Sequence, residues 1–111
     1  LAIGTNSLAA SAMLRSGADA IATGENPVVV AARTADLIVG PLGIITADAL
    51  HGEITPAMAL AVAQSRAHKI LLPISKCNVS IVGRQDLSLG EMISLALEEI
   101  QTFLDSYPPQ R

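Results

Sequence analysis

Aromatic residues are nearly absent from this chain, which has one phenylalanine, one tyrosine and no tryptophan. Basic residues are also few: seven Lys and Arg stand against ten Asp and Glu, so the formal net charge is −3. Proteins that bind nucleic acids need clustered basic side chains or aromatic rings on which bases can stack. The composition therefore predicts no nucleic-acid partner.

Cysteine is almost missing as well. The single thiol, Cys77, cannot form a disulfide within the chain, which is typical of proteins in a reducing compartment. No apolar run approaches the roughly 20 residues that a membrane-spanning helix needs. No basic segment precedes an apolar one, as it would in a secretory signal. We expect a cytoplasmic protein with no membrane partner.

Charged residues make up only 15% of the chain and hydrophobic residues 50%, with a mean hydropathy of +0.48. A typical domain has about a quarter of its residues charged. The excess of apolar side chains should leave apolar surface exposed, which favours a homo-oligomer. The 111 residues are enough for one domain. We expect it to span residues 1–107, followed by a disordered tail over 108–111 that begins at the first of two prolines.

Short apolar segments alternate with segments of helical periodicity. Buried strands are predicted over residues 1–4, 19–23, 37–40 and 69–74, and a half-exposed edge strand over 78–82. Strands that alternate with helices imply parallel pairing with right-handed crossovers. Strands that are apolar throughout are covered on both faces. The sequence predicts an α/β domain of the three-layer, Rossmann-like kind with a mostly parallel sheet.

The helix boundaries rest on capping signals. A first helix is predicted over residues 8–16, with Thr5, Asn6 and Ser7 all offering N-cap oxygens. Further helices are predicted over 28–33, with Asn26 as N-cap and Pro27 in the first position, and over 55 to about 68. His68 would then lie at a helix C-terminus, where its charge suits the dipole. A short helical turn is ambiguous over residues 44–50. Ser88 and Glu91 form a capping box for a last helix with one apolar stripe.

Polar residues and glycines follow the predicted strands. Ligands bind beyond the carboxyl ends of parallel strands, where glycine backbone and helix N-termini are available. Each of these residues taken alone is equally well explained as a helix cap or a turn. Together they predict a ligand-binding edge formed by Thr5, Asn6, Gly24, Glu25, Asn26, Gly40, Gly43 and Asn78.

Other ionisable residues have a functional and a structural interpretation. Asp48, His51 and Glu53 are close enough in sequence for acid–base catalysis or metal binding, but a solvated loop explains them better. Cys77 follows Lys76, whose charge could activate the thiol; a buried structural thiol is the commoner case. We therefore predict no metal site, assign no catalytic residue or cofactor, and leave open whether the protein is an enzyme.

Three signatures of nucleotide and hydrolase sites are missing: Gly-x-Gly-x-x-Gly, the P-loop and Gly-x-Ser-x-Gly. A dinucleotide-binding enzyme places an acidic residue near the end of its second strand, to hold the ribose hydroxyls. If residues 1–4 are that strand, Thr5 and Asn6 stand there instead. The standard mode of NAD binding is therefore not supported.

Several short segments spread over nearly the whole chain form a more specific set. They are Gly4-Thr5-Asn6, Ala22-Thr23-Gly24-Glu25-Asn26, Val39-Gly40-Pro41 with Gly43-Ile44, Gly52-Glu53 with Thr55-Pro56, and Cys77-Asn78 leading to Val82-Gly83. This set resembles a bacterial family of uncharacterised proteins, domain of unknown function 3842. The resemblance implies a short Rossmann-like protein that begins with a strand and a glycine-rich loop of the nucleotide-binding kind.

This chain opens at Leu1, inside an apolar run, and lacks both features. We expect upstream residues to be missing. Because the first strand of a Rossmann order lies in the middle of the sheet, its loss should leave a gap. The gap would persist unless the strands close in another order or a partner chain covers it.

We expect a protein that binds a nucleotide or another small phosphate-containing or polar ligand at the carboxyl ends of its strands. The alternative is a non-catalytic oligomeric or regulatory protein without a small-molecule ligand, in which the polar strand ends are only caps and turns.

Overall fold

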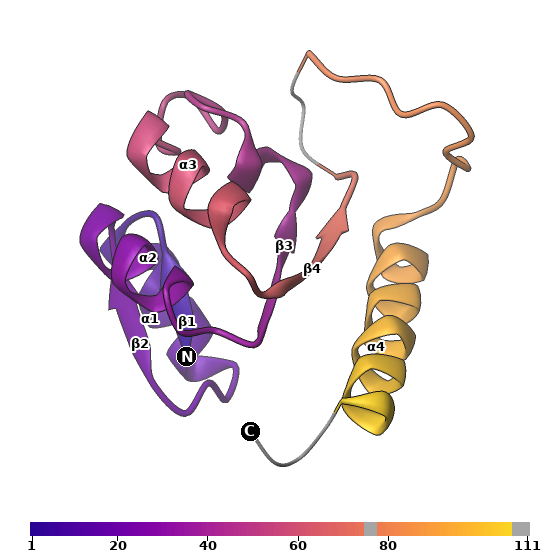
Figure 1. The fold of residues 1–111 in the computed structure, drawn as a ribbon, viewed down its shortest axis with the longest axis horizontal. Coiled ribbons are helices and arrows are strands. Elements are labelled where there is room, and N and C mark those ends of the chain that lie inside the picture. The colour runs from indigo at the N-terminus through magenta and orange to yellow at the C-terminus, as the bar shows by residue number, and fades with distance from the viewer. Residues whose placement is uncertain (75–77, 108–111) are drawn as a thin grey trace.

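The structure, a computed structural model, describes residues 1–74 and 78–107 (Figure 1). Strands and helices alternate along these residues, which confirms the α/β class. In chain order the elements are β1 (Ala2–Gly4), α1 (Ser7–Arg15), β2 (Ile21–Thr23), α2 (Glu25–Ala32), β3 (Leu37–Pro41), the 3-10 turn η1 (Leu42–Ile45), α3 (Pro56–Gln64), β4 (His68–Leu72) and α4 (Leu89–Ser106).

The four strands form two separate pairs. β1 is parallel to β2, with Ala2 opposite Ile21, and β3 is parallel to β4, with Leu37 opposite His68. The predicted parallel pairing is confirmed. Among the described residues, however, β1 and β3 are not paired with each other, so the strands form two two-stranded sheets instead of one.

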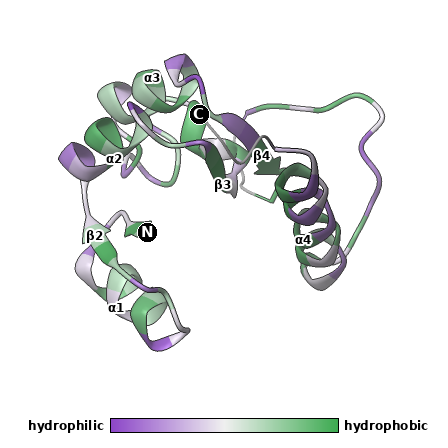
Figure 2. Ribbon diagram, turned by 60° about the horizontal axis from the view of Figure 1, so that its bottom comes forward, coloured by the Kyte–Doolittle hydropathy of each residue, from purple (hydrophilic) through white to green (hydrophobic). Residues whose placement is uncertain are grey.

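The best-packed part of the core lies under α3. Ile54, Met58 and Ala59 are buried together, and Val28 of α2 and Ile44 of η1 pack against them. The helices α2 and α3 lie side by side (Figures 1 and 2). The core therefore joins α2, η1 and α3 into one layer against the strands. None of the helices in the described part of the chain is long and apolar enough to cross a membrane.

Two helix starts agree with the sequence. The Asn6 side chain accepts a hydrogen bond from the Ala9 N–H at 2.9 Å and caps α1. The Thr55 hydroxyl accepts one from the Met58 N–H at 3.2 Å and caps α3, with Pro56 in the first helical position. In both cases a side-chain oxygen replaces a missing intrahelical acceptor, which is why such starts can be predicted from local sequence.

The predicted start of α2 was wrong. The helix begins at Glu25, and its N-cap is Gly24 (φ 93°, ψ −166°), not Asn26. Glycine reaches this backbone conformation without the steric cost of a side chain, so the chain turns out of β2 two residues earlier. Pro27 still falls in the first turn, where a missing N–H costs nothing.

The predicted end of α3 was also wrong. The helix ends at Gln64, because the Ser65 hydroxyl donates to the Ala32 carbonyl at 2.7 Å and accepts from the Ala67 N–H at 3.1 Å. These two bonds turn the chain into β4. His68 is therefore the first residue of a strand and not a helix cap.

The edge strand predicted over residues 78–82 is not formed. These residues are irregular and exposed, Val79 and Ile81 included. Two alternating apolar residues are too few to define a strand when no neighbouring strand pairs with them. The tail over residues 108–111 lies outside the described residues.

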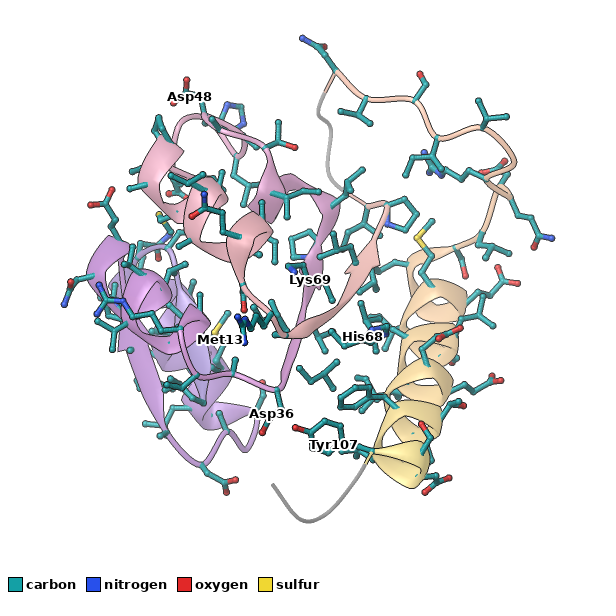
Figure 3. The ribbon with its side chains drawn as sticks, in the orientation of Figure 1. Met13, Asp36, Asp48, His68, Lys69 and Tyr107 are labelled. Carbon is teal, nitrogen blue, oxygen red and sulfur yellow. The ribbon has the colours of Figure 1, made fainter. Side chains whose placement is uncertain are left out.

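Aromatic contacts attach the C-terminal part of α4 to the sheet. The Phe103 ring stacks on the His68 ring with centroids 5.2 Å apart and planes at 7°, and the Tyr107 ring lies 4.8 Å from Phe103. The Tyr107 hydroxyl donates to the Asp36 carboxylate at 2.7 Å, next to the start of β3 (Figure 3). We call the contacts among His68, Phe103, Tyr107 and Asp36 the aromatic anchor. It includes the single phenylalanine and the single tyrosine of the chain.

The predicted apolar stripe of α4 is only partly covered. Met92 and Ala96 are buried against β4 and its neighbours. Four other apolar side chains of the stripe are exposed to solvent: Leu89, Ile93, Leu97 and Leu104. Leu97 is the most exposed of them, at 60%. More than half of the apolar face of α4 thus has no cover within the described residues.

The capping box of α4 is confirmed and predicts a pH dependence. The Ser88 hydroxyl accepts from the Glu91 N–H at 3.2 Å, and the Ser88 N–H donates to the Glu91 carboxylate at 2.9 Å. The backbone hydrogen bond from Ser88, with its side-chain bond second, lowers the pKa of Glu91 below the usual 4.5. A carboxyl group whose pKa is lowered by folding stabilises the folded state above its unfolded pKa. This contribution is lost as the pH falls through the lowered value.

We therefore expect the N-terminus of α4 to fray on acidification below about pH 4.5. Amide exchange at Ser88, followed by NMR between pH 6 and pH 3, measures it. The E91Q variant keeps the shape of the cap but does not titrate, so its Ser88 protection should change less over this range. Identical pH profiles for the two proteins would contradict the prediction.

Candidate functional site

Polar side chains meet where β1 ends. The Thr5 hydroxyl donates to one oxygen of the Glu53 carboxylate at 2.7 Å, and the Asn6 amide donates to the other at 3.4 Å. Thr5 and Asn6 directly follow β1, whereas Glu53 is more than forty residues further along. Folding therefore brings an acidic group to the end of a strand whose own sequence has none.

The end of β2 joins the same group. The Gly24 N–H donates to the Gly4 carbonyl at 3.0 Å, which holds the two strand ends together beyond their paired residues. Glu25 follows immediately, and its carboxylate accepts a hydrogen bond from the Thr55 hydroxyl. We call these residues the polar rim; it consists of Thr5, Asn6, Glu25, Glu53 and Thr55.

A compact loop before α3 holds Glu53 in place. The Asp48 N–H donates to the Ile54 carbonyl at 2.7 Å, and the Ile54 N–H donates to the Ala49 carbonyl at 3.1 Å. The loop closes through left-handed backbone at Asp48 (φ 67°), Leu50 (φ 56°) and His51 (φ 55°). Such values are uncommon for residues other than glycine and persist where surrounding contacts enforce them. Ile54, 2% exposed, anchors the loop in the core, so its neighbour Glu53 stays at the surface.

Asp48, His51 and Glu53, the candidate acid–base or metal-binding set for which a solvated loop was the preferred interpretation, do not form a common site. The Glu53 carboxylate accepts from Thr5 and Asn6, while His51 and Asp48, of which Figure 3 labels Asp48, are exposed on the loop. Within residues 1–74 and 78–107, no three His, Cys, Asp or Glu side chains are grouped so that they could hold a metal ion. Cys77 and Lys76, the candidate activated thiol and its cation, lie outside the described residues.

The electrostatics of the polar rim favour ligand hydroxyl or amino groups over a bare anion. Its two ionisable members, Glu25 and Glu53, are both acidic and exposed. The dipoles at the N-termini of α1 and α2 are already partly satisfied, by the Asn6 cap and by Glu25 in the first turn. Ionised carboxylates only accept hydrogen bonds, so a complementary ligand must donate them.

Of the eight residues predicted for the ligand-binding edge, three belong to the polar rim, Thr5, Asn6 and Glu25, and a fourth, Gly24, lies beside them at the end of β2. Asn26 is exposed beside them, in the first turn of α2. Gly43 is buried in η1, where its carbonyl accepts from the Thr46 N–H at 3.0 Å. Asn78 is exposed in the irregular segment that precedes α4. Gly40 lines a separate feature, the cavity between the two sheets.

That cavity, which we call the slot, has a volume of about 960 Å³. Ile3 of β1 and Leu1, which precedes that strand, line one side of the slot. Its lining also includes Leu37 and Val39 of β3 and Met58 of α3. Met13 of α1 reaches it from the side of that helix (Figure 3). Thr5 belongs both to the lining of the slot and to the polar rim. The slot therefore opens close to the rim.

Sequence reasoning missed the roles of Glu53 and Thr55 at the rim. Thr55 was predicted only as a helix cap. Glu53 was considered only with Asp48 and His51, as a loop residue or as part of an acid–base or metal-binding set. Neither was linked to the strand ends, because their rim partners are 30 to 48 residues away. One signal in the sequence could have indicated these roles. The segments that carry the family resemblance include Gly52-Glu53 and Thr55-Pro56 as well as Gly4-Thr5-Asn6.

A search of curated proteins and a search of solved structures found no match to this chain. One family model matches residues 1–105, which is nearly the whole sequence. The chain therefore belongs to the family described as a domain of unknown function, DUF3842.

Proposed function

We propose that this protein binds a nucleotide or a related small polar ligand at the polar rim, with Glu53 accepting hydrogen bonds from ligand hydroxyl groups. The observation that carries the proposal is the position of the Glu53 carboxylate, 2.7 Å from the Thr5 hydroxyl at the end of β1. In Rossmann-like folds an acidic residue at the end of the second strand holds the ribose hydroxyls. Here a loop residue supplies the carboxylate that the strand lacks.

A three-layer, Rossmann-like arrangement is part of this proposal. Two facts support it: the strands pair in parallel, and helices lie on both sides of them, α2 and α3 on one side and α1 and α4 on the other (Figure 2). In open parallel sheets the ligand lies beyond the carboxyl ends of the strands. The rim occupies the ends of β1 and β2 and therefore fits that rule.

The test is a thermal-shift and calorimetric screen with AMP, ATP, NAD and their dideoxyribose analogues. A ribose nucleotide present at 100 times its Kd should stabilise the protein by about 2.7 kcal/mol. The dideoxy analogues should bind at least about tenfold more weakly, because they cannot donate hydrogen bonds to Glu53.

The E53Q variant should bind the ribose nucleotide about tenfold more weakly and should no longer distinguish it from the dideoxy analogue. The E98Q variant is the matched control, since it makes the same change of charge at an exposed position of α4. No shift with any nucleotide, or equal affinities for wild type and E53Q, would refute the proposal.

The homo-oligomer expected from composition stays a prediction. Light scattering of the chain at micromolar concentration checks it, and a strict monomer would remove the main support for a purely oligomeric or regulatory role.

A further inference from the structure

The Glu53 carboxylate can accept two more hydrogen bonds than the structure gives it. An ionised carboxylate offers about four acceptor directions, two on each oxygen. The Thr5 hydroxyl takes one direction on Oε1 at 2.7 Å, and the Asn6 amide takes one on Oε2 at 3.4 Å. One direction therefore remains on each oxygen, and the side chain is exposed to solvent. Two hydroxyl groups on adjacent carbon atoms of a sugar can donate to both oxygens at once.

Several donors around this carboxylate are already in use. A hydroxyl group has one proton to donate, and Thr5 and Thr55 each donate theirs to a glutamate of the polar rim. The Gly24 N–H donates to the Gly4 carbonyl at 3.0 Å. A phosphate group presents oxygens that accept hydrogen bonds, so it needs donors. These three groups have no proton left to offer it.

Positive charge lies at the other end of the strands. Four basic side chains stand at helix C-termini or at the start of a strand: Arg15, Arg33, Arg66 and Lys69. Between parallel strands a helix returns the chain to the amino end of the next strand, so these positions are remote from the rim. Arg84 borders β4 and α4, away from the sheet of β1 and β2. Within the described part of the chain, no basic side chain is thus placed to offset Glu25 and Glu53.

We propose that the polar rim selects a ribose whose 2′- and 3′-hydroxyl groups are both free. The two hydroxyls donate to the open directions of the Glu53 carboxylate, one to each oxygen. This inference rests on the proposed function and narrows its ligand class. Nucleotides with an unmodified ribose, such as AMP and NAD, are accepted, and those phosphorylated at the 2′- or 3′-oxygen, such as NADP, are rejected. Glu53 is the residue that determines this specificity.

The rejection has two physical causes. Phosphorylation removes a hydroxyl proton, so one of the two hydrogen bonds to Glu53 is lost. It also places about 1.5 to 2 negative charges beside a carboxylate at neutral pH. Water weakens the repulsion because Glu53 is exposed. We therefore expect the phosphorylated ligand to bind about ten- to thirtyfold more weakly.

Calorimetric titration with matched ligands tests the inference. NAD and NADP differ only in the 2′-phosphate. AMP compares in the same way with adenosine 2′,5′-bisphosphate and with adenosine 3′,5′-bisphosphate. In each pair the ligand without the extra phosphate should bind at least about tenfold more tightly. Both bisphosphates should be rejected, because each of the two hydroxyls donates to one oxygen of Glu53.

Two variants of Glu53 assign the discrimination to this side chain. E53Q keeps the shape but removes the charge, so its affinities for NAD and NADP should lie within about threefold of each other. E53R should bind NADP more tightly than the wild type does, because a guanidinium pairs with a phosphate. Such a gain of binding cannot result from a loss of structure. The control E98Q, at an exposed position of α4, should keep the wild-type ratio.

The possible outcomes separate this inference from the proposed function. If no nucleotide binds, the proposed function fails and the inference fails with it. If nucleotides bind and E53Q weakens them, but NAD and NADP differ by less than about tenfold in the wild type, the proposed function stands and the selection of a free diol is overturned. Discrimination that persists unchanged in E53Q would also overturn it, since another part of the protein would then be responsible.

Discussion

Replacing Gly4 with alanine should destabilise the protein by about 3 kcal/mol or more. A Cβ atom at this position would lie 2.6 Å from the Ala10 nitrogen and 3.0 Å from both the Ala10 Cα and the Asn6 carbonyl oxygen. All three are backbone atoms at the start of α1, so the clash can be relieved only by moving the helix away from β1. Urea denaturation followed by circular dichroism gives the change in free energy of unfolding.

The matched control is G40A, the same substitution in β3. The nearest atom to a Cβ there is Ile44 Cδ1 at 2.9 Å, the end of a flexible side chain that can rotate away. Alanine also restricts the unfolded chain, which offsets part of the cost. We expect a loss below about 1 kcal/mol. Equal losses for G4A and G40A would mean that the approach of α1 to β1 is looser than the structure shows.

The second large effect is expected from M58A, with a loss of about 2–5 kcal/mol. Met58 is 3% exposed and packs with Ile54 and Ala59 in the core under α3. Truncation removes apolar contacts and leaves a cavity, because the loop anchored by Ile54 cannot collapse freely. The free energy of unfolding from chemical denaturation measures the loss.

L60A tests whether the effect belongs to the buried face. Leu60 lies two residues further along α3 and is 56% exposed. Its truncation removes little buried area and introduces the best helix-forming residue, so the change should stay within about 0.5 kcal/mol. If L60A were as costly as M58A, the assigned inner and outer faces of α3 would be reversed.

Features that depend on neighbouring residues could be predicted from the sequence. The caps Thr55 and Ser88 were predicted, and Asn6 was one of three candidates, because each satisfies backbone groups within three residues of itself. The parallel pairing of strands was predictable for a related reason: helices between apolar segments force the strands to run in the same direction.

Boundaries that depend on contacts across the fold could not be predicted. The end of α3 is set by the bond between Ser65 and the Ala32 carbonyl, and these residues are 33 positions apart. The start of α2 depends on the backbone angles of Gly24, which a glycine permits without requiring them. Local propensity contains neither piece of information.

The candidate site also combines residues that could be predicted from the sequence with one that depends on contacts across the fold. Thr5, Asn6, Gly24 and Glu25 were predicted because the ends of parallel strands share one edge of a sheet. Glu53 reaches that edge through a loop with left-handed backbone at Asp48, Leu50 and His51. Residues other than glycine seldom adopt it, so no sequence rule points to such a loop.

The aromatic anchor determines what optical spectroscopy can detect in this protein. With no tryptophan and a single tyrosine, intrinsic fluorescence and most near-ultraviolet dichroism come from Tyr107. Its hydroxyl is bonded to Asp36 and its ring lies against Phe103, so the signal reports whether α4 is docked beside β3 and β4. Melting of β1, α1 and β2 would produce no such signal. An optical transition would then describe one half of the molecule, and agreement with far-ultraviolet dichroism would be needed before the unfolding is treated as two-state.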